Sequence, residues 1–267
     1  MKAAPILFAA TMALSNAATI GVKFIDSQDT AWGAATAGAP GFAQENWNFL
    51  NTDWSGNGSN DAPLSNIITS TGAGAAELQN IAYPGHNDPV HYDAANTWRS
   101  GVGNATANDT LMNGYLDDGG NEQPYVNLSL AGVASATIVL YVHGDGANGP
   151  IGRYWLEEWT DSLAPGTVIT DQVAISQNEY AGGTFISAGT YGQTGTPGNV
   201  DVQTGNYIVF ENITANNIRI RGAGNGDPED AGRGPINGFQ VITTPVPEPS
   251  SSLLMVLAGF GLLRRRR

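Results

Sequence analysis

The chain has 267 residues, no cysteine and a formal net charge of −13 at pH 7. The lack of cysteine excludes disulfides, thiolate metal sites and a cysteine nucleophile. Hydrophobic residues make up 41% of the chain and can build a core, so global disorder is not expected, and the 35 glycines and 14 prolines are above average usage.

The first 17 residues predict a secretory signal peptide. Lys2 supplies a short positive start, residues 3–14 form an apolar stretch, and Ser15-Asn16-Ala17 provides the small residues that precede a signal peptidase cut. The stretch is shorter than the about 20 apolar residues that a membrane span needs. We expect cleavage after Ala17, and the series Asn16-Ala17-Ala18 leaves the next bond as an alternative.

Residues 18–243 predict one exported all-β domain, a two-sheet jelly-roll-like sandwich with short helices. Strands are expected at 19–26, 64–70, 90–99, 124–130, 136–143, 153–159, 167–175, 184–187, 206–212, 217–222 and 236–243. Short helices are expected at 42–50, 75–80 and 109–116. Segments 137–142 and 207–210 are apolar on both faces, which is typical of central strands. At 217–222, isoleucine alternates with arginine, which predicts one core face and one solvent face.

The charge of the body limits its partners. Residues 18–247 contain six basic and 23 acidic residues, a formal charge of −17. Nucleic acids and anionic lipids both require a positive surface, so no nucleic-acid partner is expected. No P-loop or dinucleotide-binding pattern is present, and the glycine clusters read as turns.

One predicted strand carries the candidate glycan-binding residues. Arg153, Trp155, Glu157 and Trp159 alternate with Tyr154, Leu156 and Glu158, so the first four share a face. The charged groups beside the tryptophans favour the solvent face, where two indoles would stack on sugar rings. The alternative is that both indoles pack in the core, since Trp is highly buried on average.

Acidic loops supply the candidate metal ligands. Asp117, Asp118 and Asp145 lie in glycine-rich turns and offer the oxygen ligands that Ca²⁺ prefers, although none has EF-hand spacing. We therefore expect no cofactor, with a structural Ca²⁺ at these loops as the alternative. The three histidines show no zinc-binding pattern.

The C-terminus carries three ordered elements within residues 245–267. Val246, Pro247, Glu248 and Pro249 form an extended segment, because each proline fixes φ and removes a donor. Eleven apolar residues follow at 253–263, and as a short hydrophobic helix they would span only ~16 Å. Arg264, Arg265, Arg266 and Arg267 end the chain and are expected to stay cytoplasmic. The segment therefore suits transient retention better than permanent anchoring.

This order of Pro-Glu-Pro, apolar segment and basic tail resembles the PEP-CTERM sorting signal of Gram-negative bacteria. The resemblance implies an exosortase-type processing enzyme as a partner, with cleavage near the motif after transient retention at the inner membrane. It also implies delivery to the cell envelope or the extracellular matrix, where many such proteins accompany exopolysaccharide.

The body has a weaker resemblance to galactose-binding-like and malectin-like jelly rolls. This resemblance rests on four segments: Ile20–Phe24, Asn46-Trp47-Asn48, Leu111–Leu116 and Pro235–Val241. The resemblance implies that the first and last strands lie close together.

These observations predict an exported, non-catalytic envelope or matrix protein that contacts polysaccharide. A secreted carbohydrate-active hydrolase is the alternative from another class, because 23 acids could bring two carboxylates face to face. No nucleophile elbow is present, and adjacent Glu157 and Glu158 would point to opposite faces of a strand. A purely structural protein with no specific ligand is the third possibility.

Overall fold

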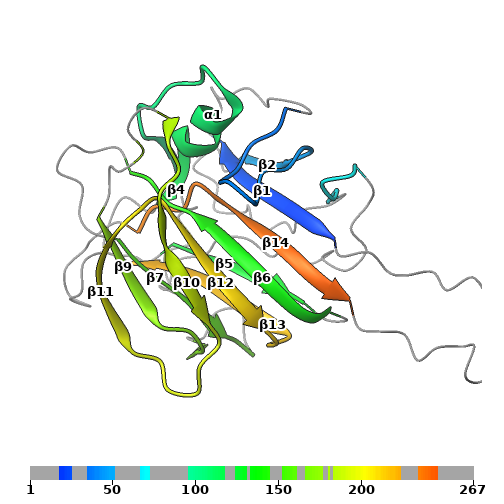
Figure 1. Cartoon of the computed structure of the whole chain (residues 1–267), viewed down its shortest axis with the longest axis vertical. Coiled ribbons are helices and arrows are strands. Elements are labelled where there is room, and N and C mark those ends of the chain that lie inside the picture. Colours follow the sequence, from blue (N-terminus) through cyan, green and yellow to red (C-terminus); the bar gives the residue numbers. More distant parts are fainter. Residues whose placement is uncertain are drawn as a thin grey trace, which may run out of the picture.

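A computed structural model describes residues 18–25, 35–51, 67–72, 96–117, 124–130, 133–144, 152–160, 166–176, 180, 183–223 and 234–245. These residues form a two-sheet β-sandwich with one short helix among them (Figure 1). The all-β sandwich predicted from the sequence is confirmed.

The first sheet has six strands, in the order β10-β12-β6-β14-β1-β2. Their bounds are β1 Thr19–Ile25, β2 Asn48–Asn51, β6 Val133–Tyr141, β10 Ser187–Gly192, β12 Tyr207–Ile213 and β14 Gly238–Pro245. The strands β6 and β12 are interior, as their two apolar faces predicted. The last strand, β14, pairs with the first, β1, in antiparallel register, which confirms that the two ends of the body meet.

The second sheet has the order β11-β9-β7-β13-β5, with β8 also paired to β7. Its strands are β5 Tyr125–Ser129, β7 Gly152–Glu158, β8 Thr167–Val168, β9 Gln172–Ser176, β11 Asn199–Thr204 and β13 Asn217–Ala223. A separate pair joins β3 (Asn96–Arg99) to β4 (Gly114–Asp117), and the helix α1 (Ala107–Asn113) directly precedes β4.

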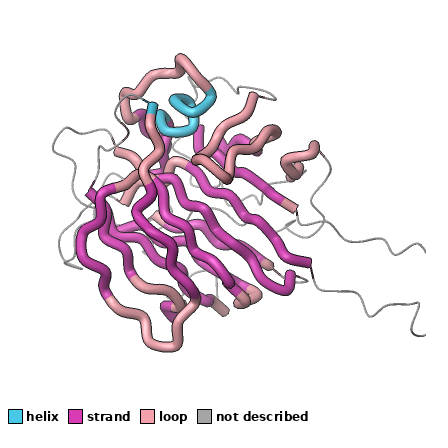
Figure 2. The backbone as a smooth tube through the Cα atoms, in the orientation of Figure 1, coloured by secondary structure: helices cyan, strands magenta, loops and turns pink. Residues whose placement is uncertain are grey.

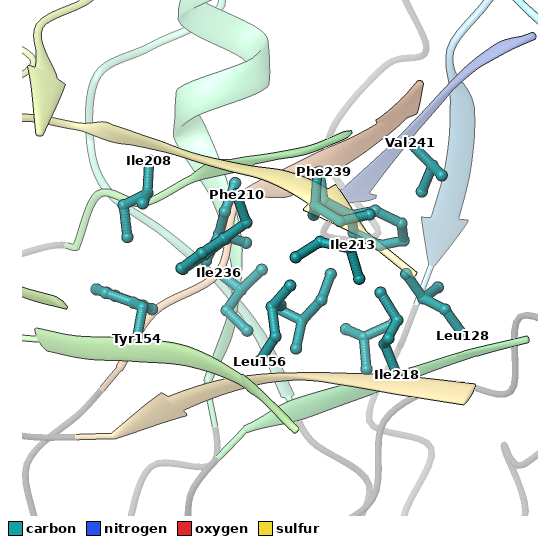
Figure 3. Close-up of a cluster of buried hydrophobic side chains, with 14 of the residues drawn as sticks. Leu128, Tyr154, Leu156, Ile208, Phe210, Ile213, Ile218, Ile236, Phe239 and Val241 are labelled. Atoms are coloured by element: carbon teal, nitrogen blue, oxygen red, sulfur yellow. The ribbon is translucent and has the colours of Figure 1, made fainter. Parts of the chain in front are cut away.

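The core lies between the two sheets, as alternation along the strands requires. Tyr154 and Leu156 of β7 and Ile218 of β13 face Phe210 of β12 and Phe239 of β14 across this space (Figure 3). All five side chains are fully buried. Apolar burial of this extent is the main driving force for the fold.

A second cluster covers the outer face of the first sheet. Tyr141 of β6 packs edge-on against Trp47, with ring centroids 5.9 Å apart, and α1 adds Leu111 and Met112. The Tyr141 hydroxyl donates to Gln240 of β14 and accepts from the Ala39 amide. Helix α1 lies at the end of the sandwich where β14 begins (Figure 2). The Asn237 Nδ2, just before β14, donates to the Met112 carbonyl of the helix at 2.8 Å.

Several predicted elements were wrong or displaced. The helix expected at 42–50 is instead a loop followed by β2, because Asn48–Asn51 pairs in parallel with β1 and this pairing overrides local helix propensity. The helix expected at 109–116 begins earlier, at Ala107, and ends at Asn113, where β4 takes over. The helix expected at 75–80 lies outside the described residues.

Candidate functional site

Strand β7 carries Arg153, Trp155 and Glu157, three of the four residues that the sequence singled out for glycan binding, and Trp159 directly follows its last residue. The strand lies in the interior of the second sheet, between β13 and β9. Tyr154 and Leu156 face the core, so Trp155 and Glu157 occupy the opposite face. The prediction that this face is open to solvent is wrong, because Trp155 is 7% exposed and Glu157 is 4% exposed. Trp155 therefore offers no open indole face on which a sugar could stack.

The Glu157 carboxylate is held by four groups. Its Oε1 accepts hydrogen bonds from the Trp155 Nε1 at 2.9 Å and from the Arg221 Nε at 3.2 Å. Its Oε2 accepts from the Gly166 amide at 3.2 Å and lies 3.7 Å from the Arg219 Nη1. Charge-assisted bonds of this kind are stronger than neutral ones, so the carboxylate is fixed in place.

Both arginines of β13 are also buried, and the prediction of a wet face at 217–222 is wrong. Arg219 has no exposed surface, and its Nε donates to the Asn127 Oδ1 at 2.7 Å. The Arg219 guanidinium lies 4.4 Å from the ring centroid of Tyr125, a cation–π contact. Strand register explains the cluster, because Arg219 lies directly opposite Glu157 on one side and Asn127 on the other. We call Tyr125, Asn127, Glu157, Arg219 and Arg221 the arginine–glutamate cluster.

Arg153 and Trp159 lie at the two ends of this strand and are half-buried. The Arg153 Nη1 reaches the Asn199 Oδ1 of β11 at 3.4 Å, whereas the Trp159 Nε1 donates to the Ile218 carbonyl at 2.9 Å. The four predicted residues thus lie along β7 and at the residue that follows it, but they form no common exposed surface. They hold the second sheet together.

A different place in the fold has the form of a binding site. A pocket of about 620 Å³ lies beside the start of α1. Among the described residues, it is lined by Val102, Thr106, Asn108, Asp109, Tyr180 and Gly183. None of these residues was predicted as a site residue from the sequence. The Thr-x-x-Asp spacing of Thr106 and Asp109 is the one local signal, since it is typical of a helix start.

Hydrogen bonds fix the polar side of this pocket. Thr106 and Asp109 form a capping box, in which each side chain accepts from the other's backbone amide at 3.1 Å and 3.0 Å. The Tyr180 hydroxyl donates to the Asp109 Oδ1 at 3.2 Å. Burial, followed by the negative charge of Asp109, raises the pKa of Tyr180, so this hydroxyl remains a donor.

The His143 ring packs against the Tyr180 ring, with the two ring centroids 6.0 Å apart. It is 7% exposed, and its Nδ1 has no hydrogen-bond partner within the described part of the chain. Burial lowers the pKa of His143 to about 4, so the imidazole is neutral at physiological pH.

Several other predicted residues are not placed by the structure. Ala17, Val246, Pro247, Glu248, Pro249 and Arg264 to Arg267 lie outside the described residues, as do Asp118 and Asp145. Asp117 is placed only as the last backbone position of β4. Within the described ranges there is no group of three or more acidic or histidine side chains that could hold a metal ion. No helix in those ranges is long and apolar enough to cross a membrane.

By its fold, the protein is a two-sheet β-sandwich in which the first strand pairs with the last. The comparison with family models then identifies residues 245–267 as a PEP-CTERM protein-sorting motif. The protein is therefore exported, targeted to an exosortase and anchored transiently at the membrane before processing. No curated protein matches the chain. No solved structure matches it either, so the jelly-roll resemblance of the body stays a prediction.

The sorting motif begins on the folded body itself. Pro245, the first residue of the match, is the last residue of β14 and pairs with Val133 of β6. Two residues earlier, the Thr243 amide donates to the Ala18 carbonyl at 2.9 Å, and the Ala18 amide donates back to the Thr243 Oγ1 at 3.2 Å. The expected new N-terminus therefore lies beside the exit of the sorting tail.

Proposed function

We propose that this protein is a non-catalytic component of the cell envelope or extracellular matrix that contacts exopolysaccharide. Signal peptidase removes residues 1–17, and an exosortase-type enzyme then releases the sandwich from its C-terminal tail. The observation that carries the proposal is the sorting motif at 245–267, which begins at the last residue of an interior strand, β14. A body with this signal leaves the cytoplasm and arrives outside as a compact unit.

The charge of the body supports a neutral or cation-bridged partner. Residues 18–247 carry a formal charge of −17, and such a surface repels nucleic acid and anionic lipid. Neutral polysaccharide carries no such penalty, and divalent cations could bridge to acidic polysaccharide.

The state of Glu157 supports a non-catalytic role. A glycoside hydrolase needs two carboxyl groups facing each other across the scissile bond. Glu157, the best-placed acid of the predicted glycan strand, is buried and already holds two arginines, a tryptophan and a backbone amide. Its carboxylate has no free approach for a sugar.

The test is fractionation of native cells followed by removal of the polysaccharide. We expect the protein in the envelope or matrix fraction, its release when the polysaccharide is digested, and no liberation of reducing sugar by the purified protein. Sugar release that is abolished by a single carboxylate substitution would establish the hydrolase alternative. Retention that survives complete removal of the polysaccharide would instead favour a purely structural protein without a glycan ligand.

A further inference from the structure

The pocket beside α1 has the volume of a small-molecule site. Its volume of about 620 Å³ falls within the roughly 300–1,000 Å³ of typical ligand pockets. It is built from three separate segments: Val102 from the loop before α1, Asn108 and Asp109 from the helix, and Tyr180 with Gly183 from the chain before β10. Tertiary packing therefore forms this hollow, and no single turn of the chain could do so.

The polar groups of the pocket are pre-oriented. The Asn108 Oδ1 accepts from the Gly38 amide at 3.0 Å, which fixes the side-chain amide. No described residue accepts a hydrogen bond from the Asn108 Nδ2. Each oxygen of Asp109 accepts one bond, from Tyr180 or from the Thr106 amide. A carboxylate has about four acceptor positions, so two remain for a ligand.

The charge of the described lining disfavours an anionic ligand. Among the described lining residues Asp109 is the one charged group, and none is Lys or Arg. An anionic ligand would be repelled by the Asp109 carboxylate, and no basic side chain among the described lining residues would offset this repulsion. A purely apolar ligand would strip water from Asp109, Asn108 and Thr106 without replacing their hydrogen bonds. A neutral ligand with adjacent hydroxyl groups meets both requirements, because one hydroxyl donates to Asp109 while its neighbour accepts from Asn108.

The pocket lies away from the point where the sorting tail leaves the sandwich. Helix α1 lies near Asn237, where β14 begins, whereas the sorting tail leaves from Pro245 at the other end of that strand (Figure 1). Eight strand residues separate these points by about 26 Å. The tethered end of the sandwich and the pocket therefore lie at opposite ends of β14.

We propose that this pocket binds a short neutral saccharide segment, with Asp109 as hydroxyl acceptor, Asn108 as donor and Tyr180 as the residue that positions Asp109. The site rests on the proposed function, since it names where the polysaccharide makes contact. It replaces the predicted site at Trp155, which is buried.

The experiment measures binding of neutral oligosaccharides to the processed protein by a glycan array and then by titration calorimetry. Asp109→Asn keeps a capping oxygen but removes the charge, and Tyr180→Phe removes only the hydroxyl. We expect each variant to weaken binding about tenfold, because each loses one or two charge-assisted or positioning hydrogen bonds. Asp201→Asn and Tyr191→Phe are matched controls on exposed β11 and on β10, and we expect unchanged affinity for both.

A second readout does not depend on the variants. Titration of the isotopically labelled wild-type protein with the bound oligosaccharide is expected to shift the Asn108 side-chain amide signals. Absence of binding to every neutral oligosaccharide, or binding that is unaffected by both variants and leaves Asn108 unshifted, would overturn the proposed site. If the variants still co-fractionate with native polysaccharide, the site is wrong while the proposed function stands. If the wild-type protein fails to co-fractionate, the proposed function itself fails.

Discussion

Glu157 joins two strands of the second sheet and the residue before β8 through one carboxylate. It bonds to Trp155 on its own strand, to Arg219 and Arg221 on β13, and to Gly166 before β8. Both arginines pack over Tyr125 of β5. Removing the carboxylate breaks its ion pairs to both buried arginines, and breaking a buried ion pair by removing one partner is costly.

We expect Glu157→Gln to lower the free energy of unfolding by about 3 kcal/mol. The control is Glu158→Gln on the same strand, which is exposed and should change stability by less than about 0.5 kcal/mol. Chemical denaturation of both variants gives the comparison. Equal small effects at the two positions would show that the cluster contributes little to stability.

His143 gives the molecule a pH dependence of known sign. The unfolded chain takes up this proton near pH 6.5, whereas the folded protein does so only near pH 4. Stability from this residue is therefore complete above about pH 6.5, falls as the pH drops towards 4 and levels off below it. We expect a loss of about 2–3 kcal/mol across this window.

His143→Phe keeps an aromatic ring beside Tyr180 and cannot titrate. Thermal denaturation between pH 4 and 7 should show a flatter profile for this variant than for the wild type. Parallel profiles for the two proteins would mean that His143 is protonated equally well in the folded state.

At the scale of elements, the sequence predicted where strands lie more reliably than which face of a strand is exposed to solvent. The apolar runs at 137–142 and 207–210 correctly indicated interior strands, because a strand covered on both sides has no polar face. Alternation at Ile218 to Arg221 correctly separated two faces, but it could not tell that the arginine face is covered. The same limit applied to Trp155, whose partners Glu157 and Arg221 come together only through strand register.

The pocket beside α1 was beyond sequence reasoning for a related physical reason. Asp109 and Tyr180 are 71 positions apart, and their hydrogen bond depends on the packing of α1 over the first sheet. Only the helix start at Thr106 had a local signal. Strands β2, β4 and β11 were also missed, since short polar segments such as Asn199–Thr204 become strands by pairing at a sheet edge.

Strand β13 approaches the segment before β14 so closely at Gly222 that there is no room for a side chain. A Cβ on Gly222 would lie 2.2 Å from the Gly234 carbonyl oxygen. The obstacle is backbone, so a rotamer change cannot relieve it.

We therefore expect Gly222→Ala to destabilise the protein by about 2–3 kcal/mol. Gly192→Ala at the end of β10 is the control, because its nearest neighbour, the Glu211 carbonyl oxygen, is 3.9 Å away. Urea denaturation compares the two variants. A Gly222→Ala protein as stable as the control would show that the two segments separate easily.

At the scale of the whole molecule, the fold and the sorting motif are connected without a long linker. Residues 246–252 separate the end of β14 from the apolar run, and fully extended they reach at most about 25 Å. Before processing, the end of the sandwich that holds Ala18 and Pro245 is therefore kept close to the membrane. The α1 end points away from it.

The most direct test of export and processing is the intact mass of the protein recovered outside native cells. We predict a chain that begins at Ala18 and lacks the apolar segment and arginine tail, while a Glu248→Ala variant keeps its C-terminus and stays at the membrane. Glu211→Ala, an exposed acid on β12, should be processed like the wild type. Recovery of the complete 27.8 kDa chain from the cytoplasm, with both ends intact, would contradict this prediction.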